Sequence, residues 1–393
     1  MKPTRAIKFL FLCLFFVTPL LFTTLNSELF EMPKMFFVYI LSILITSLHL
    51  INVINFRQPL FKRSALDIPL LLFLGSQIIS TIISVDPHTS IFGYYSRLNG
   101  GLLSIISYAI LYWILVAYLD LPFKKTIIKY ALLSGVLVAI YGILEHFGID
   151  KNVWIQDVQD RVFSTFGQPN WLAAYLCILL PLCFFRSNNK KQNNFYLFCI
   201  LLFSTCLIFT KSKTGILAAL ISLPFCLNKK NYYYFFIVIA LAGFFFLNKK
   251  PASPTPPTLN ITASQDIRKI VWIGAIDLYK KYPVFGTGVE SFAYTYYWTR
   301  PAAHNLTSEW EFLYNKAHNE YINYLATTGT VGFLAYLLLI ITSLINFINP
   351  PAGGKHFFLL AAYISILITN FSGFSVVMIS LFFYLLPALA NEK

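Results

Sequence analysis

A polar cluster led by His318 stands where a long hydrophilic segment gives way to an apolar run long enough to cross a membrane. A histidine at the start of a helix feels the positive end of the helix dipole, which favours the neutral imidazole. A neutral imidazole can accept a proton from a hydroxyl group at physiological pH, as a general base does. His318 is therefore a candidate catalytic base. The alternative interpretation is an interfacial histidine that caps a transmembrane helix.

Gln168 and Asn170 form a second polar group, at the start of another apolar run. Their amides and the beginning of a helix supply neutral hydrogen-bond donors beside the ring of Trp171, a combination suited to recognising a sugar or a phosphate. Helix caps and interfacial belts of Trp and Tyr have similar sequences. Both interpretations stay open on the sequence alone.

The elements that carry these residues are predicted to be membrane helices. The chain is 57% hydrophobic and 18% aromatic but only 12% charged, which excludes an ordinary soluble domain. Apolar runs that can cross a hydrocarbon core of about 30 Å lie near 7–25, 34–54, 66–84, 100–119, 127–144, 169–185, 195–210, 214–227, 232–247, 320–347, 357–371 and 374–390. We therefore predict an all-α polytopic membrane protein with about 12 transmembrane helices.

Basic residues set the predicted orientation. Lys and Arg gather in short loops on the cytoplasmic side of a membrane, and the basic clusters of this chain fall in alternate loops, on the side shared with the N-terminus. They are Arg57/Lys62/Arg63, Lys124/Lys125/Lys129, Arg186/Lys190/Lys191, Lys229/Lys230 and Lys355. Both termini are therefore predicted to be cytoplasmic, and the first run is predicted to be an uncleaved helix because no convincing signal-peptide cleavage site follows it.

Charge and motif content narrow the class further. The net charge of +14 follows largely from the inside bias and favours contact with anionic membrane lipids, so nucleic-acid binding is not expected. The six cysteines lie in apolar runs without metal-ligand spacing, and are expected to be buried thiols. The sequence has no P-loop, dinucleotide fingerprint, paired metal-ligating histidines or Gly-x-Ser-x-Gly elbow. Neither a metal nor another cofactor is therefore expected.

The segment 248–318 is the only stretch outside the apolar runs that is as long as a small domain, and it divides the chain into 1–247, 248–318 and 319–393. After a stiff proline-rich spacer, an amphipathic helix is predicted over 264–281, with Arg268 and Trp272 four apart on one face. That helix could lie on the membrane surface. Proline and glycine in 282–288 predict a turn, and a second short helix is predicted around 307–316.

Five basic residues fall on the predicted outer side, where the charge bias disfavours them. They are Arg97, Arg161, Lys211, Lys213 and Arg268. Phosphate binding is one reason for cations in this place. The alternative is that they are snorkelling membrane anchors.

Taken in order, these segments resemble the bacterial O-antigen ligase superfamily, which also contains O-antigen polymerases and protein O-oligosaccharyltransferases. The resemblance spans roughly residues 90 to 345. It rests on Gly-Tyr-Tyr-Ser-Arg-Leu-Asn-Gly-Gly at 93–101, Gly-Gln-Pro-Asn at 167–170, Ser-Lys-Thr-Gly at 212–215, Arg268 with Trp272 and the 282–288 turn, and His318-Asn319. The family usually has arginine in place of Lys213. Lysine keeps the charge but loses the bidentate fork.

The resemblance implies metal-independent transfer of a glycan from a polyprenyl-diphosphate carrier to an acceptor hydroxyl, on the outer face of the bacterial cytoplasmic membrane. His318 would take the acceptor's proton and Arg268 would stabilise the leaving diphosphate. The implied substrate-binding residues are Lys213, Arg97, Arg161, Gln168, Asn170, Trp272 and Asn319. The sequence does not choose between a lipid, a glycan and a protein as the acceptor.

A secondary transporter is the competing class, because twelve helices with both termini inside is also a transporter layout. Two six-helix halves would be joined by a long cytoplasmic link, whereas here the link after the sixth run is short and the long loop is external. Few ionisable residues lie in the middle of the apolar runs, as ion coupling would require. The sequence therefore favours the enzyme.

Overall fold

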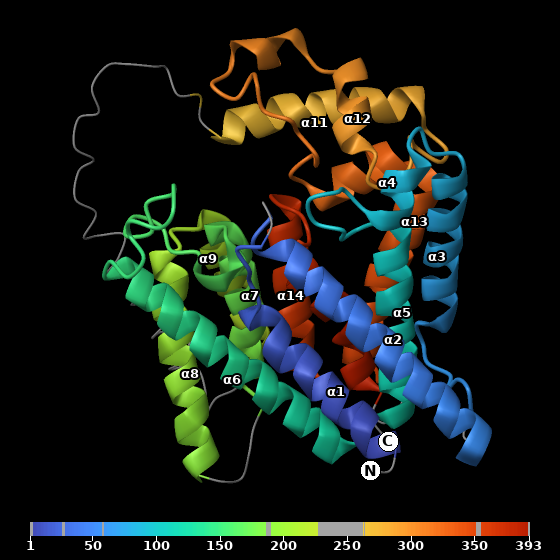
Figure 1. Cartoon of the computed structure of the whole chain (residues 1–393), viewed down its shortest axis with the longest axis vertical. Helices are drawn as coiled ribbons and strands as arrows, with labels where there is room; N and C mark the ends of the chain where they lie inside the picture. Colours follow the sequence, from blue (N-terminus) through green and yellow to red (C-terminus); the bar gives the residue numbers. More distant parts are fainter. Residues whose placement is uncertain are drawn as a thin grey trace.

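The computed structural model describes residues 3–25, 28–56, 59–185, 190–226, 262, 264–350 and 355–391. Every regular element within these ranges is a helix, as predicted. The helices form a bundle, and one helix, α11 (Ser264–Lys281), lies across the end of the bundle opposite the two chain termini (Figure 1).

The helices run in the following order. The first half contains α1 (Pro3–Val17), α2 (Glu31–Phe56), α3 (Asp67–Ile82), α4 (Pro87–Phe92), α5 (Leu102–Tyr118), α6 (Leu121–His146) and α7 (Pro169–Leu182). The second half contains α8 (Lys190–Phe209), α9 (Lys213–Ser222), α11, α12 (Phe292–Thr295), α13 (Glu320–Ile348), α14 (Phe357–Phe371) and α15 (Val377–Leu385). Short 3-10 turns connect several of them, namely η1 (Thr18–Leu20), η2 (Ser164–Phe166), η3 (Leu223–Cys226), η4 (Tyr296–Trp298), η5 (Ala302–Leu306) and η6 (Pro387–Ala390).

Within the described ranges, four segments are long and apolar enough to cross a membrane, namely Pro3–Leu20, Glu31–Phe56, Leu121–His146 and Glu320–Ile348. The other apolar segments are shorter, between 10 and 17 residues, and they include Asn193–Phe209 of α8. The predicted run 232–247 lies outside the described residues. The helical membrane-protein class is therefore confirmed, while the number of twelve spans stays a prediction.

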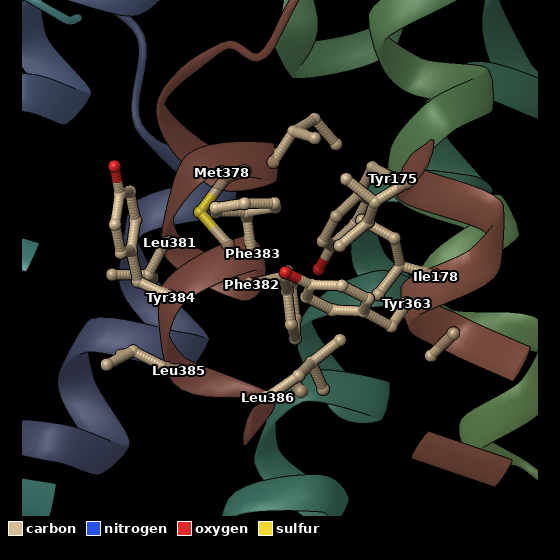
Figure 2. Packing of buried hydrophobic residues seen from close by; sticks show 14 of the residues in the cluster. Tyr175, Ile178, Tyr363, Met378, Leu381, Phe382, Phe383, Tyr384, Leu385 and Leu386 are labelled. Carbon is tan, nitrogen blue, oxygen red and sulfur yellow. The ribbon is translucent and has the colours of Figure 1, made fainter. Parts of the chain in front are cut away.

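The centre of the bundle is built from α7, α14 and α15, which are apolar on all sides because other helices surround them. All nine residues of α15 are buried. Side chains of the three helices interdigitate, and the rings of Tyr363 and Phe383 stack with centroids 5.3 Å apart (Figure 2). This packing holds the start of α7 and the end of α14 in position. Both helix ends carry polar residues of the site described below.

Helix α13 is broken at Gly329, whose φ of 64° and ψ of −166° are not helical. The 282–288 turn lies against the break. The backbone N–H of Thr330 donates to the Pro283 carbonyl at 2.8 Å, and that of Gly288 donates to the Thr327 carbonyl at 2.9 Å. A side chain at Gly329 would meet the Val284 backbone at 2.4 Å. The loop therefore forms hydrogen bonds with the backbone groups that have no partner within the broken helix. A helix break inside a membrane requires such partners.

The predicted helix over 264–281 is confirmed with those bounds as α11. That this helix lies on the membrane surface stays a prediction. Ile267, Val271 and Leu278 are buried in a separate apolar cluster with Phe292 and Tyr296 of the same loop. The loop therefore provides its own small core.

The prediction of a short helix around 307–316 is wrong, because these residues form turns and bends. Side chains near its start bond to backbone groups and hold the turns. The Thr307 hydroxyl donates to the His304 carbonyl at 2.9 Å, and the Ser308 hydroxyl accepts from the Thr262 N–H at 3.2 Å. Such local bonds compete with helix formation.

Candidate functional site

A polar pocket lies where α7 and α9 begin, α14 ends, and α11 crosses the bundle. It is lined by Gln168, Asn170, Arg268 and His318, together with hydroxyl groups from Ser212, Thr214 and Ser372. Four of the predicted site residues, from three distant parts of the sequence, therefore share one pocket. Arg268 and His318 are the only titratable side chains among the lining residues.

His318 is held in an uncommon backbone conformation, with a positive φ of 53°. The residues on both sides of it are fixed by side-chain caps. The N–H of Ala317 donates to the Asn323 side-chain oxygen at 3.1 Å, and Asn319 is the N-cap of α13. The imidazole of His318 stands edge-on to the ring of Phe374, with centroids 5.4 Å apart. A non-glycine residue at positive φ in a candidate site is consistent with positioning for function.

The environment of His318 disfavours its protonated form. Burial of the ring, followed by the positive charges of Arg268 and Arg97, lowers its pKa to about 4. The imidazole is therefore neutral at physiological pH, as a proton acceptor must be. Its low pKa also makes it a weak base. An anion beside the two arginines would offset their charge and strengthen the base.

Arg268 and Trp272 lie one turn apart on α11 and anchor that helix over the pocket. An Arg268 side-chain N–H (Nη1) donates to the Ser372 carbonyl at 2.8 Å. The indole N–H of Trp272 donates to the Ala317 carbonyl at 2.9 Å, one residue before His318. Trp272 is not among the residues that line the pocket, so its bond positions the His318 segment.

Arg97 lies beside the pocket, with its guanidinium between two aromatic rings. The guanidinium carbon is 5.0 Å from the Trp171 centroid and 4.9 Å from that of Phe374, within the range of cation–π attraction. Its Nε and Nη1 are buried and have no hydrogen-bond partner within the described part of the chain. A buried guanidinium with open donors is suited to receiving an anionic ligand.

Arg161 stabilises the pocket through hydrogen bonds to residues next to it. Its Nε donates to the Thr210 carbonyl at 3.0 Å, and its Nη2 donates to the Asn170 side-chain oxygen at 3.2 Å. The Ser212 hydroxyl donates to the same Asn170 oxygen at 2.9 Å. These bonds join the starts of α7 and α9. The structure therefore places Arg161 as a positioning residue and not among the lining residues.

Gln168 precedes α7 as its N-cap residue and leaves an acceptor open. Its side-chain oxygen is buried without a partner among the described residues. Because Gln168 lines the pocket, a ligand hydroxyl is a suitable donor for this oxygen. This geometry fits the sugar-recognition interpretation better than a cap alone, since the Gln168 side chain makes no capping bond.

Two further predicted substrate-binding residues do not line the pocket. Lys213 is the first residue of α9, but its side chain is exposed and is not among the lining residues, whereas Ser212 and Thr214 on either side line the pocket. Asn319 is buried, and its oxygen accepts the N–H groups of Tyr321 and Ile322 at 3.0 and 3.1 Å. Its side chain therefore caps α13 and does not reach the pocket.

The end of α14 and the segment after it belong to the site but were not predicted from the sequence. Asn370, Ser372, Gly373 and Phe374 all line the pocket, although in the sequence they mark the boundary between two apolar runs. The signal was present, because Asn370 and Ser372 place polar groups at the end of an apolar run. The Ser372 hydroxyl also bonds to that of Thr214 at 2.7 Å, which joins α14 to α9.

Residues 198–337 match the family model described as O-antigen ligase. The match covers 140 of the 393 residues. The matched part contains Arg268, His318 and the α9 start, while Arg97, Arg161, Gln168 and Asn170 reach the same region from outside it. The resemblance to the O-antigen ligase superfamily is thereby confirmed. No curated protein matches the chain.

Proposed function

We propose that this protein is an integral-membrane glycosyltransferase of the O-antigen ligase type. It moves a glycan from a polyprenyl-diphosphate carrier to an acceptor hydroxyl on the outer face of the bacterial cytoplasmic membrane. The observation that carries the proposal is the shared pocket of His318 and Arg268, with Arg97 beside it, in a chain whose residues 198–337 match the O-antigen ligase family model.

In the proposed step, the acceptor oxygen attacks the anomeric carbon of the donor sugar. The bond between that carbon and the diphosphate oxygen breaks, and the diphosphate lipid leaves with the bonding electrons. His318 takes the proton of the acceptor hydroxyl. Arg268 stabilises the charge that develops on the leaving diphosphate, and Arg97 adds a second fixed positive charge. Because a diphosphate is already a good leaving group, the step needs neither ATP nor a metal.

The remaining polar groups bind and orient the substrates. Gln168 and Asn170 offer hydrogen-bonding groups to a sugar or to the diphosphate from the start of α7. Asn319, Trp272 and Arg161 hold these elements in place through the bonds described above. Lys213, exposed at the start of α9, contributes a charge near the pocket in this proposal and not a direct contact.

An O-antigen-type polymerase and a protein O-oligosaccharyltransferase would use the same residues, so the acceptor decides among the three. Mass spectrometry of envelope glycans, lipids and proteins from cells with and without this protein tests the proposal. Loss of the protein should leave glycan on the diphosphate carrier and remove it from one acceptor class. Unchanged glycan in all three fractions would contradict the proposal.

The active pocket must face away from the cytoplasm for this function. We expect a single cysteine at Leu306, which is 88% exposed, to react with an impermeant maleimide in cells whose outer membrane has been opened. A cysteine at Lys125, in a predicted cytoplasmic loop, serves as the matched control and should react only after the inner membrane is opened. Both are introduced after the six native cysteines are replaced. The reverse labelling pattern would overturn the orientation.

The pH dependence of transfer should report the depressed pKa of His318. Since its pKa in the free protein is about 4, the base stays active as pH falls through the range where an ordinary histidine protonates. We expect kcat/KM for the donor to be flat from pH 8 to about pH 5 and to fall below that. Arg268→Gln removes a positive charge and should move the acid limb to higher pH. A wild-type limb near 6.5, unmoved in the variant, would contradict this electrostatic assignment.

A further inference from the structure

A second pocket adjoins the first and has no role in the step proposed above. Two segments of chain contribute to both pockets. His318 lines the first while Lys316 and Glu320 line the second, and Phe374 lines the first while Ser375 lines the second. Asn99, two residues from Arg97, also lines the second pocket. The two pockets are therefore neighbours along the His318 and Phe374 segments.

The second pocket contains carboxylate oxygens that lack hydrogen-bond donors. Glu290 and Glu320 are only 6% and 7% exposed. In each, the Oε2 atom is buried without a partner in the ranges that the structure describes. Lys316 pairs with the other oxygen of Glu290. A buried carboxylate oxygen without a donor is costly unless something else supplies one.

The other residues that line the second pocket indicate which kind of ligand could donate hydrogen bonds to these carboxylate oxygens. Lys316 pairs with Glu290, and Glu320 adds no positive charge, so the pocket has no free cation among its described lining residues to attract a diphosphate. Asn99, Asn323 and Ser380 add neutral hydrogen-bonding groups, and Tyr108, Tyr324 and Tyr384 add aromatic rings. Apolar rings combined with a few polar groups are usual in sites for small organic ligands. Neutral hydroxyl groups satisfy carboxylate oxygens, and the ring faces suit the carbon-bound hydrogens of a sugar.

We propose that this second pocket is an acceptor subsite that binds a sugar of the acceptor glycan through hydroxyl groups donating to Glu290 and Glu320. The inference rests on the proposed function and specifies its acceptor as a carbohydrate-bearing molecule. The bound sugar lies next to the one whose hydroxyl reacts at His318. The first pocket, which contains Arg268, binds the diphosphate of the donor.

The test is steady-state transfer in vesicles with the full-length protein. The donor and acceptor are purified from the envelope of cells that make this protein, and each is varied while the other is saturating. Glu320→Gln should raise the KM for the acceptor by about tenfold or more, as leaving a buried polar group without its hydrogen bond does. The KM for the donor should stay within about twofold. Glu290→Gln should act in the same direction.

Thermal stability separates binding from a structural role. The Oε2 of Glu320 has no partner to lose, so Glu320→Gln should unfold at or above the wild-type temperature. A structural carboxylate would instead lower that temperature and leave the acceptor KM unchanged. Glu145→Gln is the matched control, because Glu145 is also buried with one partnerless oxygen but lines neither pocket. It should leave the acceptor KM unchanged.

Each other outcome has a distinct meaning. A rise in donor KM alone would assign the pocket to the donor glycan and overturn the acceptor subsite. Unchanged KM values for both substrates in Glu320→Gln and Glu290→Gln would show that water alone fills the pocket and would also overturn it. If the wild-type protein breaks no bond between glycan and diphosphate, the proposed function itself fails.

Discussion

Replacing His318 should reduce glycan transfer by about 10²- to 10⁴-fold, the usual contribution of a general base. His318→Asn is the preferred variant, because asparagine tolerates the positive φ of this position but cannot take up a proton at neutral pH. His318→Ala should lose transfer as well, with an added cost in backbone strain. Transfer is measured in reconstituted vesicles at equal amounts of protein.

The control for this variant is His88→Asn. His88 is exposed on α4 and does not line either pocket, so this change should leave the transfer rate near wild type. A His318→Asn protein that is present at normal abundance and transfers glycan at a near-normal rate would remove the general-base role. His318 would then be an interfacial cap, the alternative that the sequence left open.

Replacing Arg268 should have the second large effect. Arg268→Ala removes the positive charge that lines the pocket together with His318, and loss of a donor that stabilises a leaving group costs roughly 10²-fold or more in rate. Arg268→Lys should recover only part of the activity, because lysine keeps the charge but not the planar fork. Because Arg268 also donates to the Ser372 carbonyl, thermal unfolding of both variants must be measured with the rates.

Lys269→Ala provides the matched control on the same helix. Lys269 is the neighbouring cation, but it is exposed and pairs with Asp266, so its loss should leave transfer nearly unchanged. Near-wild-type rates in Arg268→Ala and Arg268→Lys would instead identify Arg268 as a surface anchor. The phosphate role would then be wrong.

Local sequence signals were sufficient for the elements that carry the site. The apolar spacing in 264–281 and the proline and glycine that follow it predicted α11 with its bounds. The polar residues at 318 and 319, placed just before an apolar run, predicted the start of α13. These signals work because helix ends and amphipathic faces depend mainly on nearby residues.

The direction in which side chains point depended on tertiary packing and was not predicted. Lys213 and Thr214 are adjacent, yet only Thr214 lines the pocket, because the packing of α9 against α14 decides which face is covered. The α14–α15 connection was not predicted to belong to the site for the same reason, because it contacts the start of α7 only in the folded bundle. The carboxylates of the second pocket come from segments far apart in sequence, so no local motif marked them.

The proposed function is tested most directly by following the bond between the glycan and the diphosphate. The purified protein is placed in vesicles with lipid-linked donor and acceptor, and released polyprenyl diphosphate is measured together with glycan on the acceptor. Glycosyl transfer predicts one diphosphate lipid released for each glycan that reaches the acceptor, with both lost in His318→Asn. Glycan that crosses the bilayer while still attached to its lipid, without release of diphosphate lipid, would identify a transporter and contradict the enzyme.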